Sequence, residues 1–106
     1  MPSHDIPAPI NHPGSVPWNI PAGAAQVLVY NPPPPIGTNP ANLPNTTFEV
    51  KTATTPNAAL QHTQTFTLDN TNSQLHPVVI PMTPIPAKGT PWQVINTGTR
   101  TIRVEW

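Results

Sequence analysis

The alternation of apolar and polar residues is clearest near the end of the chain. Apolar side chains occupy even positions on both sides of Asn96-Thr97-Gly98, whereas most odd positions are polar. A repeat of two residues is typical of a strand with one buried face. Asn96-Thr97-Gly98 suits a three-residue turn with its glycine in the left-handed region. The pattern predicts a β-hairpin over residues 91–106 that pairs Trp92 with Ile102, with Ile95 as an apolar exception on the polar face.

Four earlier stretches also show strand patterns, at residues 22–30, 46–53, 62–69 and 78–82. No segment shows a helical repeat over a useful length. The sequence therefore predicts an all-β fold, either a small β-sandwich or a jelly-roll-like barrel. We expect the core to combine residues from these strands with residues of the terminal hairpin, namely Val27, Val29, Phe48, Phe66, Leu68, Trp92, Val94, Ile102, Val104 and Trp106.

Prolines recur every few residues between positions 1 and 22, and a tetraproline follows at 32–35. Proline has no amide proton and restricts the residue before it, so the first segment cannot form a helix or a central strand. We interpret residues 1–22 as an extended proline-rich N-terminal arm and residues 23–106 as the β-sandwich body. Apolar residues spaced along the arm would bind a groove on a partner: Ile6, Ile10, Val16, Trp18 and Ile20. The alternative is that the arm packs across its own sheet.

Composition narrows the possible functions. The chain has 106 residues, 18 prolines, 5 glycines and no cysteine, and only 8% of its residues are charged, against about 25% in ordinary domains. Four basic residues balance four acidic ones, so no basic surface for nucleic acid is expected. The absence of cysteine excludes disulfides and thiolate metal sites. With neither a signal peptide nor a membrane-length apolar run, we expect a soluble protein made in a cytoplasm.

The titratable residues do not form a recognisable catalytic or metal-binding pattern. The four carboxylates, Asp5, Glu49, Asp69 and Glu105, lie on separate predicted elements, which argues against an acid–base pair. The four histidines, His4, His12, His62 and His76, lack the spacing that places two metal ligands on one face. Two alternatives stay open: a site formed by His62 and His76 on neighbouring strands, or a three-fold cluster, metal-binding or pH-sensitive, of one histidine near the axis of a trimer. We predict no catalytic residues, no metal and no cofactor.

The tryptophans allow two interpretations. Trp18, Trp92 and Trp106, together with Tyr30, could form a stacking platform for a sugar ring. Large aromatic residues more commonly fill the core or a subunit contact in a domain of this size. We therefore assign Trp92, Val94, Ile102, Val104 and Trp106 to the core or to a subunit interface.

In general character the chain resembles the decoration, or cement, proteins of tailed bacteriophage heads. The resemblance covers the whole chain as a plan: about a hundred residues, no cysteine, a proline-rich first segment with spaced apolar residues, and an all-β body whose last strand reaches Trp106. It includes no diagnostic motif.

The resemblance implies a non-enzymatic virion protein on the outer surface of a capsid, made in the host cytoplasm. Its partner would be the major capsid protein, which the arm would clamp, and it would form a homo-oligomer, with a homotrimer favoured. No contact with nucleic acid or membrane is implied. We also expect the last strand to seek subunit contacts as an open edge. The alternative is a small carbohydrate-binding β-sandwich, such as a virion or cell-surface adhesin, and an enzyme is the least favoured class.

Overall fold

Two four-stranded antiparallel sheets form the protein, so the predicted all-β sandwich is confirmed. The computed structural model describes residues 2–10, 14–33, 37, 45–52, 61–81 and 92–106, with the backbone alone at 61–63. These residues form eight strands: β1 (Ser3–Ile6), β2 (Val16–Asn19), β3 (Gln26–Tyr30), β4 (Thr46–Thr52), β5 (Gln61–Leu68), β6 (Val78–Pro81), β7 (Trp92–Asn96) and β8 (Ile102–Glu105).

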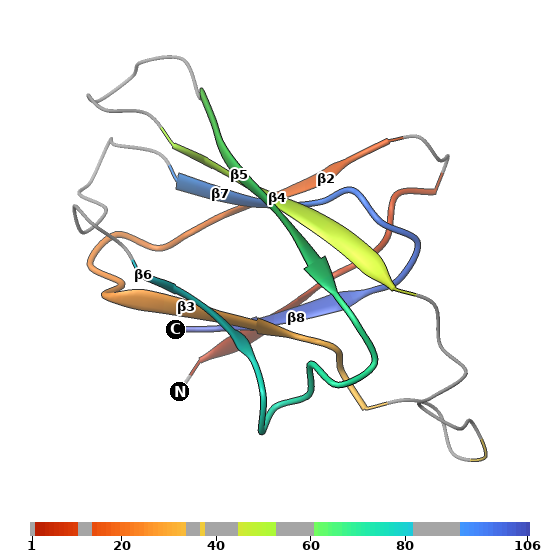
Figure 1. Ribbon diagram of the computed structural model, residues 1–106. Helices are drawn as coiled ribbons and strands as arrows, with labels where there is room; N and C mark the ends of the chain where they lie inside the picture. The colour runs from red at the N-terminus through yellow and green to blue at the C-terminus, as the bar shows by residue number, and fades with distance from the viewer. Residues whose placement is uncertain (1, 11–13, 34–36, 38–44, 53–60, 82–91) are drawn as a thin grey trace.

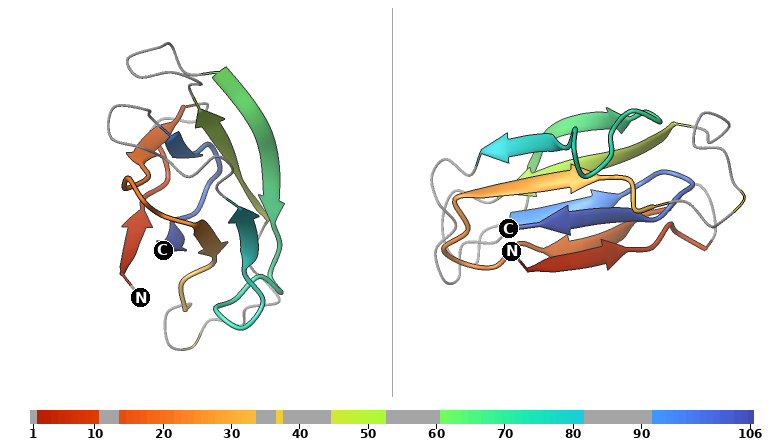
Figure 2. Two further views of the ribbon diagram at one scale, coloured as in Figure 1. Left: turned by 90° about the vertical axis from the view of Figure 1, so that its left-hand side faces the viewer. Right: turned by 90° about the horizontal axis from the view of Figure 1, so that it is seen from below.

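The strand order identifies the topology. One sheet has the order β1-β8-β3-β6 and the other has the order β2-β7-β4-β5. Every strand of the first half therefore pairs with its counterpart counted back from the end: β1 with β8, β2 with β7, β3 with β6, and β4 with β5. This is the pairing of one long hairpin wrapped into two layers, the jelly roll. Figures 1 and 2 show the two layers, with β1 and β2 along one side and β5 and β6 along the other.

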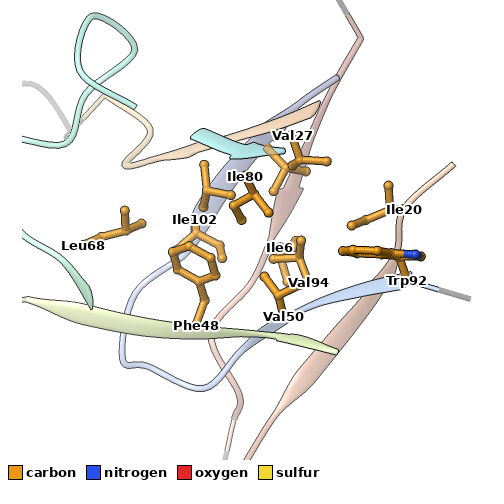
Figure 3. Close-up of a cluster of buried hydrophobic side chains, with 12 residues drawn as sticks. Ile6, Ile20, Val27, Phe48, Val50, Leu68, Ile80, Trp92, Val94 and Ile102 are labelled. Carbon is orange, nitrogen blue, oxygen red and sulfur yellow. The ribbon is translucent and has the colours of Figure 1, made fainter. Parts of the chain in front are cut away.

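The core lies between the sheets and follows from the alternation of side chains along each strand. Val27 and Val29 of β3 face Phe48 and Val50 of β4, and Phe48 stacks on Phe66 with ring centroids 5.0 Å apart. The buried cluster, most of which Figure 3 labels, is completed by residues of other strands and by Ile20, which follows β2: Ile6, Ile20, Leu68, Ile80, Trp92, Val94, Ile102 and Val104. All ten residues predicted for the core lie in this cluster or pack against it.

The N-terminal segment belongs to the sandwich. β1 pairs with β8 and β2 pairs with β7, each as the edge strand of its sheet. An edge tolerates proline because only one side of the strand needs hydrogen bonds, and Pro17 lies within β2. This corrects the expected division into an arm at 1–22 and a body at 23–106: the alternative, in which the segment packs on its own sheets, describes the fold.

The predicted terminal hairpin is wrong, because β7 and β8 lie in different sheets. Trp92 pairs with Thr52 of β4, and Ile102 pairs with Ile6 of β1. The apolar alternation in both strands is nevertheless real, since each strand faces the same core from its own layer. Ile95 is buried on the outer face of its sheet, opposite Glu49 and Pro17. β8 is a central strand between β1 and β3, so the expectation of an open last strand is also wrong.

Asn96 and Gly98 direct the crossing from one sheet to the other. The buried Asn96 amide donates to the carbonyl oxygens of Ile6 (3.1 Å) and Arg100 (2.7 Å), and its Oδ1 accepts from the Gly98 N–H at 3.0 Å. A Cβ on Gly98 would lie 2.6 Å from the Thr47 nitrogen. Gly98 therefore permits a close approach of two backbones, whereas the left-handed conformation predicted for it occurs at Gly23 and Gly37.

Candidate functional site

The five residues predicted to bind a partner lie in different environments. Ile6 and Ile20 belong to the buried core, and Val16 and Trp18 are partly buried against it. The prediction that these four residues bind a groove on a partner is wrong, because their side chains pack in or against the core of the sandwich itself. Ile10 differs from them: it lies in the connection between β1 and β2, and 98% of its surface is exposed.

Three rings close the side of the sandwich where β1 and β2 meet. His4 stacks on Trp18 with ring centroids 5.6 Å apart, and Trp18 contacts Trp106 at 4.9 Å and a tilt of 47°. Trp18 belongs to one sheet, whereas His4 and Trp106 belong to or follow strands of the other. Trp18 thus contacts two other rings, and Trp92 is buried in the core. The geometry does not bring the tryptophans together as an open sugar-stacking surface.

Polar side chains connect three strands on the outer face of the β1-β8-β3-β6 sheet. Arg103 of β8 donates to both carboxylate oxygens of Asp5 on β1, at 2.6 and 3.1 Å. This hydrogen bonding holds the pKa of Asp5 below its ordinary value. The Tyr30 hydroxyl donates to Glu105, and burial, followed by the Glu105 carboxylate, raises the pKa of Tyr30. These contacts hold the first, last and third strands in register.

The connection from β5 to β6 lies against the end of β3. The Asn31 backbone N–H donates to the Asn72 carbonyl at 2.8 Å, and the Asn31 amide donates to the Asp69 carbonyl at 2.7 Å. Gln74 donates to Glu105 at 3.2 Å. Between these elements lies a cavity of about 300 Å³, which we call the loop cavity; it is lined by Tyr30, Asn31, Pro32, Pro33, Asn70, Asn72, Ser73, Gln74, Leu75 and Arg100. Leu75, which lines this cavity, has 85% of its surface exposed.

A second cavity, the edge cavity, opens between β5 and β6 on the opposite side of the sandwich from the three rings. Its volume is about 340 Å³, and it is lined by Val50, Gln64, Phe66, Val79, Ile80, Pro81 and Trp92. Sequence reasoning identified neither cavity. The edge cavity is lined by residues of four strands, and the loop cavity by residues from three separate parts of the chain, so no local pattern indicates that they meet.

Each of the four carboxylates has a contact with another residue of the chain. Asp5 binds Arg103, Glu49 lies 4.0 Å from Lys51, and Glu105 accepts from Tyr30. Asp69 accepts hydrogen bonds from the Thr71 backbone and hydroxyl. Among the described residues no group of three or more His, Cys, Asp or Glu side chains could hold a metal ion. His12 and the side chain of His62 lie outside the described part of the chain. The metal site considered for His62 and His76 therefore stays a prediction.

The described chain contains no helix long and apolar enough to span a membrane. Comparisons of the chain with protein-family models, with curated proteins and with solved structures find no match.

Proposed function

We propose that this protein is a non-enzymatic virion protein that decorates and stabilises a capsid, with the β1–β2 connection as a docking element. Its partner is the major capsid protein, and it lies on the capsid outer surface as a homo-oligomer, with a homotrimer favoured. The observation that supports docking through this connection is the exposure of Ile10, at 98% of its surface.

Ile10 suits a contact with another protein surface. It follows Pro7 and Pro9, which restrict the backbone and reduce the conformational entropy lost on docking. Both ends of the connection are fixed, since β1 and β2 are paired edge strands. Burying an isoleucine side chain contributes roughly 1.5–3 kcal/mol, so one such contact changes affinity by about ten- to a hundredfold.

The topology supports the proposal by analogy. Jelly rolls are frequent in viral capsid proteins and in lectins, although one fold carries many functions. The low charge of the chain, 8% of residues, also suits a surface that packs against protein, because fewer charges lose their hydration on contact.

The fold determines how this proposal is tested. Deleting residues 1–22 would remove β1, β2 and the core residues Ile6 and Ile20, so the truncated chain would lose stability for reasons unrelated to docking. The informative change is Ile10→Ser, because Ile10 has almost no contact within its own fold. Leu75→Ser is the matched control, because it removes a similar amount of exposed apolar surface from another part of the molecule.

The assay is co-sedimentation of each variant with heads of the virus that encodes the chain. We expect Ile10→Ser to reduce affinity for the heads about ten- to a hundredfold, and Leu75→Ser to bind as the unmodified protein does. Equal binding by both variants would exclude Ile10 as the docking residue. Failure of the unmodified protein to bind heads would exclude capsid decoration.

The loop cavity favours a second candidate, a carbohydrate-binding β-sandwich. Amide and hydroxyl side chains from Asn72, Ser73 and Gln74 line it beside the apolar Leu75, and such combinations bind sugars through hydroxyl and C–H contacts. Binding of the protein to a glycan array that Leu75→Ser abolishes and Ile10→Ser does not affect would support this function over capsid decoration.

A further inference from the structure

β5 is the sheet edge with the least protection against pairing with another strand. The edges of the two sheets are β1, β6, β2 and β5. The first three have four residues each, and each includes a residue that discourages strand addition: Asp5 in β1, Pro81 in β6 and Pro17 in β2. β5 has eight residues, Gln61–Leu68, with no proline and no Asp, Glu, Lys or Arg. Among the described strands it pairs with β4 alone.

The outer side of β5 is exposed, and part of its backbone is directed there. Figure 2 shows β5 along the outside of the sandwich, and Gln64, Thr65 and Thr67 are exposed. The Thr47 carbonyl accepts from the Thr97 N–H at 3.2 Å, on the β7 side of β4. Thr47 lies opposite Thr67, so these two residues do not exchange hydrogen bonds. The N–H and C=O of Thr67 therefore point to the outer edge.

The sequence of this edge is complementary to itself. The pairing of β5 with β4 shifts register before Gln64, so the regular part of β5 is Gln64–Leu68. Within it, the residues Thr65, Phe66 and Thr67 read the same in both directions. An antiparallel pair of β5 strands with Phe66 opposite its own copy places Thr65 opposite Thr67 on both sides of the axis. No like charges meet in such a pair, which removes the usual cost of placing a strand against itself.

Phe66 adds an apolar contact to this pair. Its ring stacks on Phe48 and is only partly buried. Val79 of β6, which lines the edge cavity together with Phe66, is 52% exposed. Opposite residues of an antiparallel pair have Cβ atoms about 4.5–5.5 Å apart, close enough for two aromatic rings to pack. A second copy would thus cover apolar surface that the single chain leaves in contact with water.

We propose that two copies of this chain associate through β5 about a two-fold axis at Phe66, so that their β2-β7-β4-β5 sheets join into one eight-stranded sheet. The backbone of Thr67 in each copy exchanges hydrogen bonds with the backbone of Thr65 in the other. A two-fold contact forms a dimer or joins two trimers into a hexamer, so it differs from the trimer contact of the proposed function. It leaves the β1–β2 connection accessible, because β1 and β2 lie on the other side of the sandwich (Figures 1 and 2).

Paired charges test the register of this contact. The side chains of Thr65 and Thr67 are exposed, and in the proposed register each lies opposite the other across the axis. Thr65→Lys/Thr67→Lys therefore places like charges opposite one another, whereas the matched variant Thr65→Lys/Thr67→Glu places opposite charges there. We expect the first variant to associate about five- to thirtyfold more weakly than the second at low salt. The difference should shrink in about 1 M salt.

A backbone variant tests strand pairing itself. Thr67→Pro removes an N–H that points away from β4, so the fold keeps its own hydrogen bonds while each copy loses one donor at the contact. We expect this variant to associate at least about tenfold more weakly than the unmodified protein. Thr67→Val, the control, keeps the N–H and should associate normally.

Sedimentation equilibrium over a range of concentrations measures the association. Because the contact is small, association should rise with concentration. We expect a dimer that Thr67→Pro converts to a monomer, or a hexamer that it converts to a trimer. A monomer or a trimer of the unmodified protein up to its solubility, an assembly that Thr67→Pro leaves intact, or equal association of the two charge variants would overturn the proposal. If Thr67→Pro fails to fold, the two charge variants, which alter only exposed side chains, decide the question.

Discussion

Asn96→Asp tests whether the Asn96 amide holds the crossing between the two sheets. The substitution keeps the size of the side chain but replaces an –NH₂ donor by an oxygen. The side chain is fully buried, and the new oxygen would face the carbonyl oxygens of Ile6 and Arg100 at the positions where the amide now donates, 3.1 and 2.7 Å away. Each carbonyl that loses its donor costs about 1–3 kcal/mol. We expect a total loss of about 2–5 kcal/mol of unfolding free energy at neutral pH.

The loss should depend on pH with a defined sign. Burial and the two facing carbonyl oxygens disfavour the ionised form, so the folded-state pKa of the introduced carboxyl lies above its unfolded value of about 3.9. Below that value the group is protonated in both states and can donate one hydrogen bond. As pH rises from there to the folded-state pKa, stability falls by about 1.4 kcal/mol per pH unit. The variant should therefore be closest to the unmodified protein in acid.

The assay is urea unfolding followed by tryptophan fluorescence across this pH range, with the slope m compared between proteins. Asn19→Asp is the matched control, since Asn19 is exposed and its Oδ1 already accepts from Gln93 at 2.8 Å. We expect the control to change stability by less than about 0.5 kcal/mol. Equal stability of the two variants at neutral pH, or a difference that does not narrow toward acid, would refute the structural role assigned to Asn96.

Two further predictions concern the outer face of the β1-β8-β3-β6 sheet. Tyr30 is the single tyrosine of the chain, so an ultraviolet titration of the phenolate reports on this residue alone. The hydroxyl should ionise above the ordinary tyrosine pKa of 10.0 in the folded protein and near 10 in urea. Identical titrations in both states would contradict the buried contact with Glu105. The raised pKa also means that its stabilising effect is present below pH 10.0 and is lost as pH rises through the folded-state value. Asp5→Asn should lower stability by about 0.2–1 kcal/mol at neutral pH, because the pair with Arg103 is partly exposed. In thermal unfolding that difference should disappear as pH falls below 3.8 through the lowered folded-state pKa of Asp5, and its persistence in acid would show that the ion pair is not its cause.

Local pattern was sufficient to predict most of the strands and the core. Val27 and Val29, or Phe48 and Val50, alternate with polar or outward-facing neighbours, and this repeat depends only on the pleat of a single strand. The fold class followed from the same signal. The buried Ile95 was recognised as an exception to the alternation, and it lies on the outer face of its sheet.

Pairing between distant strands could not be predicted in the same way. Asn96-Thr97-Gly98 has the composition of a tight turn, but the buried Asn96 amide binds Ile6, 90 residues away in sequence, and directs the chain into the other sheet. The prolines near Ile6 and Trp18 indicated an extended chain. Both a free arm and an edge strand are extended, so the prolines could not distinguish between them. The two cavities depend on these same pairings, so they were equally inaccessible to local reasoning.

The pairing of β1 with β8 determines when the protein can complete its fold during synthesis. Residues 3–6 leave the ribosome well before the strand with which they pair, residues 102–105, has been made. At the usual rate of about 5–20 residues per second, Ile6 is without its partner strand for roughly 5–20 s. Closing so large a loop is slow, and β1, with its single apolar residue Ile6, stays unpaired throughout this interval. Translation rate and chaperone access should therefore affect the yield of this protein more than that of a domain whose neighbouring strands pair locally.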